Sequence, residues 1–382
     1  MRVSFRTMIT VKTFSIILAM TALARTALAL DANTTAQIES LFSNFDHPNA
    51  PGASVMVIRD GKPIFAKGFG LADLEKKTPC TTNTNFRLAS VTKQFTAMAV
   101  LILAERKALS LDEPLPAFFP EFPDYGKQIT VSQLLTHTSG LIDYEDEIPT
   151  NTTIPVLDQD VLRILLKQSS TYFSPGSQFR YSNSGYSLLA LIVEARSGQT
   201  FARFLKENIF EPLKMTNTLA YEQGLAVVPN RAYGHTLNKD SLAPADGERA
   251  RVRGTNFTRT DQNLTSSVLG DGGVYSSVTD LFKWDQALYK SKLVSERTLR
   301  QAFTPATATD KPDRSYGFGW YISEYRGLKE IWHSGTSIGF RNRLVRFPEK
   351  QFTVIILANR ADAKLDELPH QIADLVLFDA MK

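Results

Sequence analysis

A serine and a lysine stand three residues apart in Ser90-Val91-Thr92-Lys93, at the head of a strongly apolar run over residues 95–104. If that run is a helix, positions i and i+3 share one face, so the hydroxyl and the amine lie close together. A serine is a poor nucleophile until a base removes its proton, and a buried, partly neutral lysine can be that base. The tetrad therefore predicts a covalent serine hydrolase, although it also suits a plain helix start with the serine as cap.

A second segment that can do chemistry is Tyr181-Ser182-Asn183, which follows the turn residues Ser174-Pro175-Gly176. A helix predicted over 185–196 begins just after it, so the segment lies in a loop, where catalytic side chains are often displayed. A tyrosine there can shuttle protons if a nearby ammonium lowers its pKa, and an asparagine can orient a lysine or hold a substrate carbonyl. A turn with a packed tyrosine and an asparagine cap is the structural alternative.

The third segment, His333-Ser334-Gly335-Thr336, ends a predicted strand. Glycine at an exposed strand edge lets a substrate backbone approach closely. The backbone N–H of Thr336, together with that of Ser90, can then form an oxyanion hole for charge that develops in the transition state. The structural alternative is a strand end that carries a surface histidine.

No metal or nucleotide pattern is present in the sequence. Gly270-Asp271-Gly272-Gly273 lacks the lysine of a phosphate-binding loop and predicts a tight turn before a short strand, so we expect no cofactor. We also expect no metal site and no nucleophilic thiol, because metal-ligand spacing is absent among the histidines and the single cysteine, which are His47, His137, His235, His333, His370 and Cys80.

The first 29 residues predict a signal peptide, with a basic start, a short apolar stretch over 13–24 and Ala27-Leu28-Ala29 as cleavage site. We therefore expect an exported protein, periplasmic or secreted, without a stable membrane anchor after cleavage. The whole chain has 43 Lys and Arg against 39 Asp and Glu, and the signal holds four of the basic residues and no acid. The remaining chain is balanced, which argues against a nucleic-acid or membrane partner.

Strand patterns stand at both ends of the chain, with helical patterns between them. A hairpin is predicted over 53–59 and 63–69 around Asp60-Gly61, and a capping box, Thr130-Val131-Ser132-Gln133, opens a short helix that ends near residue 140. Further strands are predicted over 317–325, 329–333, 341–347 and 352–358. A first helix over 34–45 is expected outside the core, and a last helix over 363–381 is expected to be kinked at Pro369.

These patterns predict an α+β fold in which the N-terminal hairpin joins the C-terminal strands in one antiparallel sheet, flanked by the terminal helices. Residues 30–382 are expected to form one hydrolase domain with a sheet lobe over about 30–80 and 307–382 and a helical lobe over about 81–306. A catalytic cleft between the lobes follows from this arrangement.

The three chemical segments occur in an order that resembles the penicillin-recognising serine hydrolases. The chain is most similar to the branch of class C β-lactamases and D-alanyl-D-alanine carboxypeptidases, with the related family VIII esterases and D-aminopeptidases. Supporting segments in 35–380 are residues 134–141, 175–176, 270–276, 316–320 and 339–340.

The resemblance implies a β-lactamase/transpeptidase-like fold and a role for each matching residue. It implies that Ser90 is acylated, that Lys93 is its general base and that Tyr181 carries protons to and from the leaving group. Asn183 resembles a substrate-amide contact, and Ser334, Gly335 and Thr336 resemble the substrate-binding strand that contributes to the oxyanion hole.

One departure concerns substrate choice, because the third motif of this family usually begins with lysine and here begins with His333. A neutral imidazole attracts a substrate carboxylate weakly and becomes charged only below its pKa. Arg341 and Arg343 follow as candidates to replace the lost charge, or as solvated strand residues. Expected substrates are esters, D-amino-acid peptides or β-lactams, and the alternatives to an esterase or peptidase are a β-lactamase proper or a sensor that binds penicillin or cell-wall fragments without turnover.

Overall fold

The computed structural model describes residues 30–222, 224–238 and 257–378 of the 382-residue chain. The predicted signal peptide over 1–29 lies outside these ranges, so it remains a prediction. Among the described residues, no helix combines the length and apolarity that a bilayer crossing requires.

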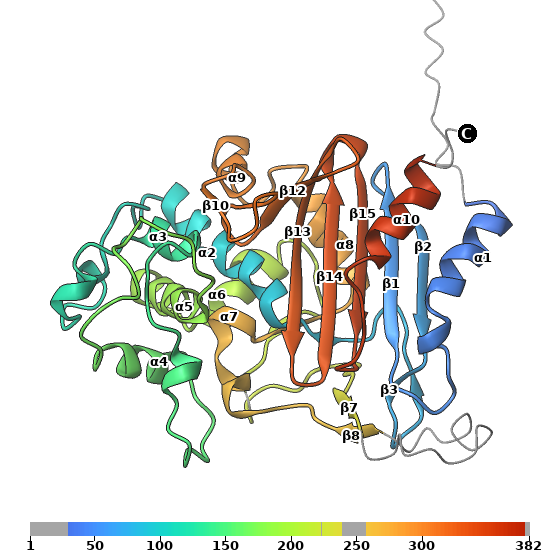
Figure 1. Cartoon of the computed structure of the whole chain (residues 1–382), viewed down its shortest axis with the longest axis horizontal. Helices are drawn as coiled ribbons and strands as arrows, with labels where there is room; N and C mark the ends of the chain where they lie inside the picture. The colour runs from blue at the N-terminus through green and yellow to red at the C-terminus, as the bar shows by residue number, and fades with distance from the viewer. Residues whose placement is uncertain (1–29, 223, 239–256, 379–382) are drawn as a thin grey trace, which may run out of the picture.

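An eight-stranded antiparallel sheet forms one side of the molecule, in the order β10-β11-β12-β13-β14-β15-β1-β2 (Figure 1). β1 (Ala53–Arg59) lies between β15 (Phe352–Ala358) and β2 (Lys62–Phe69), so the N-terminal hairpin joins the C-terminal strands as predicted. Asp60 and Gly61 both have positive φ, at 51° and 74°, which is the backbone that a two-residue hairpin turn requires.

The C-terminal strands differ from the prediction in their bounds. β12 begins only at residue 321, because Gly319 in the preceding turn has a positive φ of 78°. β13 continues four residues beyond His333, because its pairing with β14 runs from Ile331–Arg346 to Ser337–Phe340. The bounds are β10 (Thr307–Ala308), β11 (Ser315–Tyr316), β12 (Tyr321–Tyr325), β13 (Leu328–Ser337) and β14 (Phe340–Phe347).

Both terminal helices lie at the β1–β2 side of the sheet (Figure 1). The expectation that the first helix packs outside the core is wrong, because Ile38 of α1 (Ala32–Leu41) and the following Phe42 are completely buried against the sheet. α10 (Leu368–Ala373) starts where a kink was predicted, since Pro369 occupies its first turn, where a missing N–H costs nothing. A π-helical turn (Asp374–Phe378) follows.

Helices fill the other side of the molecule around a central one, α2 (Lys93–Glu105), which is buried from Lys93 to Leu103. Thr130 and Gln133 form the predicted capping box, although the helix that they open ends at Leu135. The remaining helices are α3 (Val131–Leu135), α4 (Asp158–Leu165), α5 (Asn183–Ser197), α6 (Phe201–Leu205), α7 (Leu269–Gly272), α8 (Val278–Ala287) and α9 (Glu296–Ala302).

A small three-stranded sheet lies among these helices, and one of its strands comes directly before the segment that carries Ser90. It pairs β5 (Phe86–Arg87) and β6 (Leu219–Ala220) with β9 (Val274–Ser276). β5 leads into the turn that carries Ser90, and β9 follows the glycine-rich segment. The fold is thus α+β, as predicted.

Candidate active site

Ser90 lies in a 3₁₀ turn (Ala89–Thr92) between β5 and α2. Ala89 has a positive φ of 48°, an unusual backbone for alanine, and it turns the chain sharply just before Ser90. The Ser90 side chain caps no helix in this turn, so the helix-cap interpretation is wrong. Ser90 instead remains partly exposed at the head of a buried helix, where a nucleophile can meet substrate.

The Lys93 side chain is completely buried and points its amine at three oxygen atoms. Nζ lies 3.1 Å from Ser90 Oγ, 2.8 Å from Asn183 Oδ1 and 2.9 Å from the backbone carbonyl oxygen of Asp271. Burial lowers the pKa of Lys93, against the opposing effect of nearby carboxylates. A lysine with a lowered pKa beside a serine hydroxyl is able to accept the hydroxyl proton.

Tyr181 and Asn183 join Lys93 at the start of α5. The Tyr181 ring lies 4.9 Å from Lys93 Nζ, and burial raises the Tyr181 pKa, which a hydrogen bond to Ser90 partly opposes. Proton shuttling by Tyr181 was expected to need a nearby ammonium that lowers its pKa. The Tyr181 pKa is raised instead, so the hydroxyl keeps its proton. Asn183 is the first residue of α5, where Ser182 rather than Asn183 is the cap, and its amide orients Lys93.

His333 lies on β13 and is 1% exposed, so the surface-histidine interpretation is wrong. Its Nε2 lies 3.0 Å from the Tyr316 hydroxyl and its Nδ1 lies 2.6 Å from the Ser334 carbonyl oxygen, which makes Nδ1 the protonated nitrogen. Burial, together with the charge of Lys93, lowers the pKa of His333 to about 3. The His333 imidazole is therefore neutral at physiological pH. Its ring centre lies 6.2 Å from that of Tyr181.

The end of β13 meets the turn that carries Ser90. β12 pairs with β13 only as far as Trp332, so residues 333–337 have strand β14 on one side alone. A Cβ atom on Gly335 would lie 2.0 Å from the Leu88 carbonyl oxygen. The glycine therefore leaves room for the protein's own nucleophile segment, and the approach of a substrate backbone to this strand edge stays a prediction. Thr336 is exposed beside this contact.

A cavity of about 210 Å³ opens beside Ser90. Its wall is almost entirely polar and includes Ser90, Asn183, Glu145 and Thr336. Ser334, which is predicted to bind substrate, is not among the residues that line this cavity, and its backbone carbonyl oxygen accepts a hydrogen bond from His333. Burial, and then the charges of Asp271 and Asp143, raise the pKa of Glu145 to about 7. No cluster of metal-ligating side chains occurs in the described ranges.

Sequence reasoning missed several residues that surround these groups. Glu145 accepts a hydrogen bond from Asn183 Nδ2 at 3.3 Å, and Asp271 accepts one from the Tyr144 hydroxyl at 3.0 Å. His137 accepts the backbone N–H of Ser182 at 3.1 Å, which fixes the loop that carries Tyr181. His137 and Asp271 lie within the family-like segments 134–141 and 270–276, so those segments were the available signals, whereas no local pattern marks Tyr144 and Glu145.

The two arginines considered as replacement charges have other partners. Arg341 donates to the carbonyl oxygens of Ser337 and Phe340, at 2.6 and 2.8 Å, and so stabilises the β13–β14 turn. Arg343 is buried over the Trp332 ring at 3.8 Å. Both arginine side chains thus make their contacts within the sheet.

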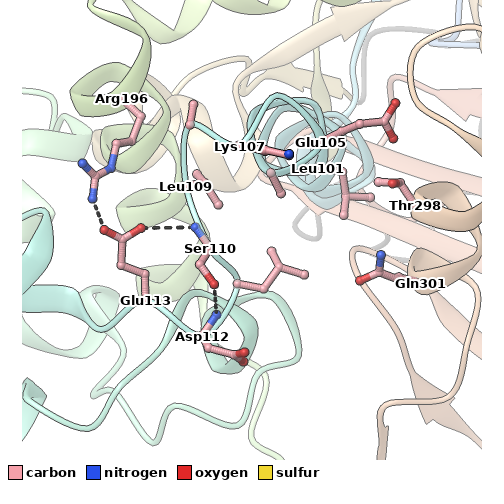
Figure 2. A pocket seen from close by; sticks show the side chains of 13 residues that line it. Leu101, Glu105, Lys107, Leu109, Ser110, Asp112, Glu113, Arg196, Thr298 and Gln301 are labelled. Atoms are coloured by element: carbon pink, nitrogen blue, oxygen red, sulfur yellow. Dashed lines mark hydrogen bonds and ion pairs between the residues drawn. The ribbon is translucent and has the colours of Figure 1, made fainter.

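A larger cavity of about 750 Å³ lies at the C-terminal end of α2, and Figure 2 shows its lining. Its wall joins Glu105 of α2 with Thr298 and Gln301 of α9, and Glu113 forms an ion pair with Arg196 at its other side (Figure 2). None of the predicted site residues lines it. The smaller cavity beside Ser90 is therefore the candidate active site.

Comparisons with known proteins agree with this geometry. A family model described as Beta-lactamase matches residues 38–377. Penicillin-binding protein 4* of Bacillus subtilis (strain 168) is 31% identical over 357 residues, which cover 91% of this chain and 76% of that protein. D-aminopeptidase of Brucella anthropi is 29% identical over 315 residues, which cover 81% of this chain and 56% of that protein.

A solved structure extends the agreement to the fold. The octameric penicillin-binding protein homologue from Pyrococcus abyssi has a TM-score of 0.77 and 26% identity, over 91% of this chain and 78% of that one. The family match begins within α1 and ends within the last turn, and it includes Ser90, Tyr181 and His333. The chain therefore belongs to the β-lactamase family, in the superfamily of serine hydrolases that also includes penicillin-binding proteins.

Proposed function

We propose that this protein hydrolyses an ester or amide through an acyl-enzyme on Ser90, with Lys93 as the base. The observation that supports this most strongly is the 3.1 Å contact between Lys93 Nζ and Ser90 Oγ, in a chain where burial lowers the pKa of Lys93. Two further acceptors, on Asn183 and Asp271, aim the amine at the hydroxyl. The nucleophile Ser90 thus contacts the base Lys93, and Lys93 in turn contacts the groups that orient it, as covalent catalysis requires.

In the proposed reaction, Ser90 Oγ attacks the substrate carbonyl carbon while its proton passes to Lys93 Nζ. The backbone N–H groups of Ser90 and Thr336 stabilise the oxyanion. A proton then passes from Lys93 through the Tyr181 hydroxyl to the leaving oxygen or nitrogen, and the carbon–heteroatom bond breaks. Water attacks the acyl-enzyme by the same route in reverse, which releases the acid and restores Ser90. Because His333 is neutral and bonded to Tyr316, its proposed part is to hold the aromatic cluster behind Tyr181.

The charge of the cavity favours one range of substrates. Above about pH 7, where Glu145 is ionised, a carboxylate beside the scissile bond would meet the Glu145 anion at the cavity wall and an uncharged His333 nearby. We therefore propose neutral esters and amides as substrates, ahead of carboxylate-bearing peptides and β-lactams. Glu145 also favours a substrate that carries an amine, which supports an aminopeptidase-like activity as the second candidate, in line with the relative named D-aminopeptidase.

The proposed site of action is outside the cytoplasm, which rests on the signal pattern in residues 1–29. A sensor that is acylated without turnover is the alternative at the same site. The two are distinguished by product release: a hydrolase releases acid and leaving group repeatedly, whereas a sensor stops after one leaving group per protein.

The test is turnover of a p-nitrophenyl ester by wild type and by Ser90→Ala. We expect the substitution to reduce kcat/KM by at least about 10³-fold, since it removes the nucleophile. Ser40→Ala, at the end of α1 and far along the chain from the site, is the matched control and should keep full activity. Unchanged turnover in Ser90→Ala would remove Ser90 from the mechanism.

A further inference from the structure

Asp271 is a buried acid whose carboxylate takes no part in the steps above. It lies on the short helix α7 and is 6% exposed. Its backbone carbonyl oxygen accepts a hydrogen bond from Lys93 Nζ at 2.9 Å, and its carboxylate accepts one from the Tyr144 hydroxyl at 3.0 Å. One residue thus presents both a carbonyl dipole and a carboxylate close to the base.

The surrounding structure fixes the position of α7. Asp158 accepts hydrogen bonds from the backbone N–H groups of Leu269 and Gly270, at 2.8 and 3.1 Å. The Thr96 hydroxyl on α2 donates to the Gly270 carbonyl oxygen at 2.7 Å. The Asp271 carbonyl oxygen contacts Lys93 Nζ, so the carboxylate of the same residue lies no more than about 8 Å from Nζ, given ordinary bond lengths. At that range two buried charges interact appreciably.

Each member of this pair favours the charged form of the other. Burial raises the pKa of Asp271, and the charge of Lys93 lowers it. Burial lowers the pKa of Lys93, and Asp271 raises it more than any other neighbour does. The other titratable groups that face the pair are Asp143, Glu145, Tyr181, Tyr186, His137 and His333 around Lys93, and Asp158, Tyr144 and Arg87 around Asp271.

We propose that Asp271 is the anionic partner of Lys93: its carbonyl orients the amine, and its carboxylate stabilises the ammonium that forms when Lys93 takes the Ser90 proton. This rests on the proposed function, because it assigns Asp271 a part only if Lys93 is the base. The arrangement parallels the acid–base–nucleophile order of a catalytic triad. Asp271 acts through Lys93, so it is a positioning residue rather than one that touches substrate.

The test is the pH dependence of kcat/KM in Asp271→Asn, which keeps the shape of the side chain and an oxygen for Tyr144. A base works when it is deprotonated, so activity rises as pH rises through the Lys93 pKa. Removal of the anion lowers that pKa, so the acid limb of the profile should move to lower pH by about one unit. The plateau should fall by up to about tenfold, because a weaker base accepts the proton less readily.

Two further variants separate this part from a structural one. Tyr144→Phe removes the donor that stabilises the Asp271 anion, so its acid limb should move in the same direction by less. Asp158→Asn weakens the hold on α7 and also removes an acid that disfavours the Asp271 anion, so it should lower the melting temperature while its acid limb stays in place or moves to higher pH, opposite to that of Asp271→Asn. Acid limbs at the wild-type pH in both Asp271→Asn and Tyr144→Phe would overturn the inference.

Labelling by a fluorophosphonate, followed across the same pH range, gives a readout that does not depend on the substrate. Asp271→Asn should be labelled at a lower pH than wild type, and Ser90→Ala should not be labelled. If Ser90→Ala is labelled, the proposed function fails. If Ser90→Ala is not labelled and the Asp271→Asn profile coincides with that of wild type, only the inference about Asp271 fails.

Discussion

The Lys93 amine has three oxygen neighbours, and a neutral amine has two hydrogens to donate. Asn183 Oδ1 and the Asp271 carbonyl oxygen can only accept, so they take these two hydrogens. The lone pair then faces Ser90, whose hydroxyl is able to donate. In the neutral lysine this pattern of partners turns the lone pair toward the nucleophile, which is the geometry that a general base needs, whereas the ammonium donates to all three oxygens.

Glu145 carries the prediction on substrate choice. Its carboxylate lies on the wall of the cavity and accepts a hydrogen bond from Asn183 at 3.3 Å. Glu145→Gln should lower kcat/KM for a D-alanine p-nitroanilide, which has a free amine, by about tenfold relative to its N-acetyl counterpart, because it removes one charge-assisted contact.

Glu147→Gln is the matched control, since it removes an acid from the same 3₁₀ turn (Tyr144–Glu147) outside the cavity wall. It should leave the ratio of the two substrates unchanged. An equal loss on both substrates in Glu145→Gln would show that the carboxylate acts through Asn183 alone and not on the amine.

Among single residues, those whose types form a recognisable motif were predicted from the sequence, and those whose role depends on distant contacts were missed. Ser90, Lys93, Tyr181 and Asn183 were identified because their types and order form a pattern, and the structure places them in one contact network. Asp271 was assigned to a plain turn, because nothing in a glycine-rich segment indicates that its carbonyl oxygen will meet a lysine 178 residues earlier in the chain.

At the scale of elements, β13 and β14 together hold the segment that precedes Ser90. Asn342 on β14 donates to the carbonyl oxygens of Arg87 and Leu88, at 2.8 and 3.1 Å, and Gly335 on β13 leaves room for the same segment. The sheet edge therefore serves as the support on which the nucleophile turn rests.

Gly335→Ala tests this support. The added methyl would lie 2.0 Å from the Leu88 carbonyl oxygen, so the backbone must shift. We expect kcat/KM to fall by about 10²-fold, since a displacement of about 1 Å at a reacting group costs that much. Gly185→Ala on α5 is the control, because its methyl would meet nothing closer than 3.4 Å. Similar activity in both alanine variants would contradict the account of β13.

Element bounds were predicted well where the signal is local and less well where distant contacts decide. The turn at Asp60-Gly61 and the capping box at Thr130 are local, and both are confirmed. The extension of β13 beyond His333 depends on pairing with β14, and the burial of α1 depends on sheet strands far along the chain. A pattern within one segment cannot report such partners.

At the scale of the whole molecule, α8 connects the sheet to the helix that carries Lys93. Asp285 forms a buried ion pair with Arg346 on β14 at 2.7 Å and accepts the Thr353 hydroxyl of β15 at 2.9 Å. The neighbouring Trp284 donates to Gln94 on α2 at 2.9 Å. α8 is thus a further link between the sheet and α2, and it does not line the cavity beside Ser90.

Asp285→Ala should lower the free energy of unfolding by about 3–5 kcal/mol, because it leaves the buried guanidinium of Arg346 without its partner. Denaturant melts measure this. Glu296→Gln removes the exposed pair with Arg300 on α9 and should change the free energy by less than about 1 kcal/mol. Equal losses in the two variants would contradict the role given to α8.

The central claim, that Ser90 is the nucleophile, is tested most directly by intact-protein mass spectrometry after incubation with a fluorophosphonate, which phosphonylates a reactive serine with loss of fluoride, followed by mapping of the modified peptide. The account predicts one adduct per chain on the peptide that contains Ser90, and none in Ser90→Ala or Lys93→Ala at neutral pH. A full adduct on another residue, or on Ser90→Ala, would contradict it.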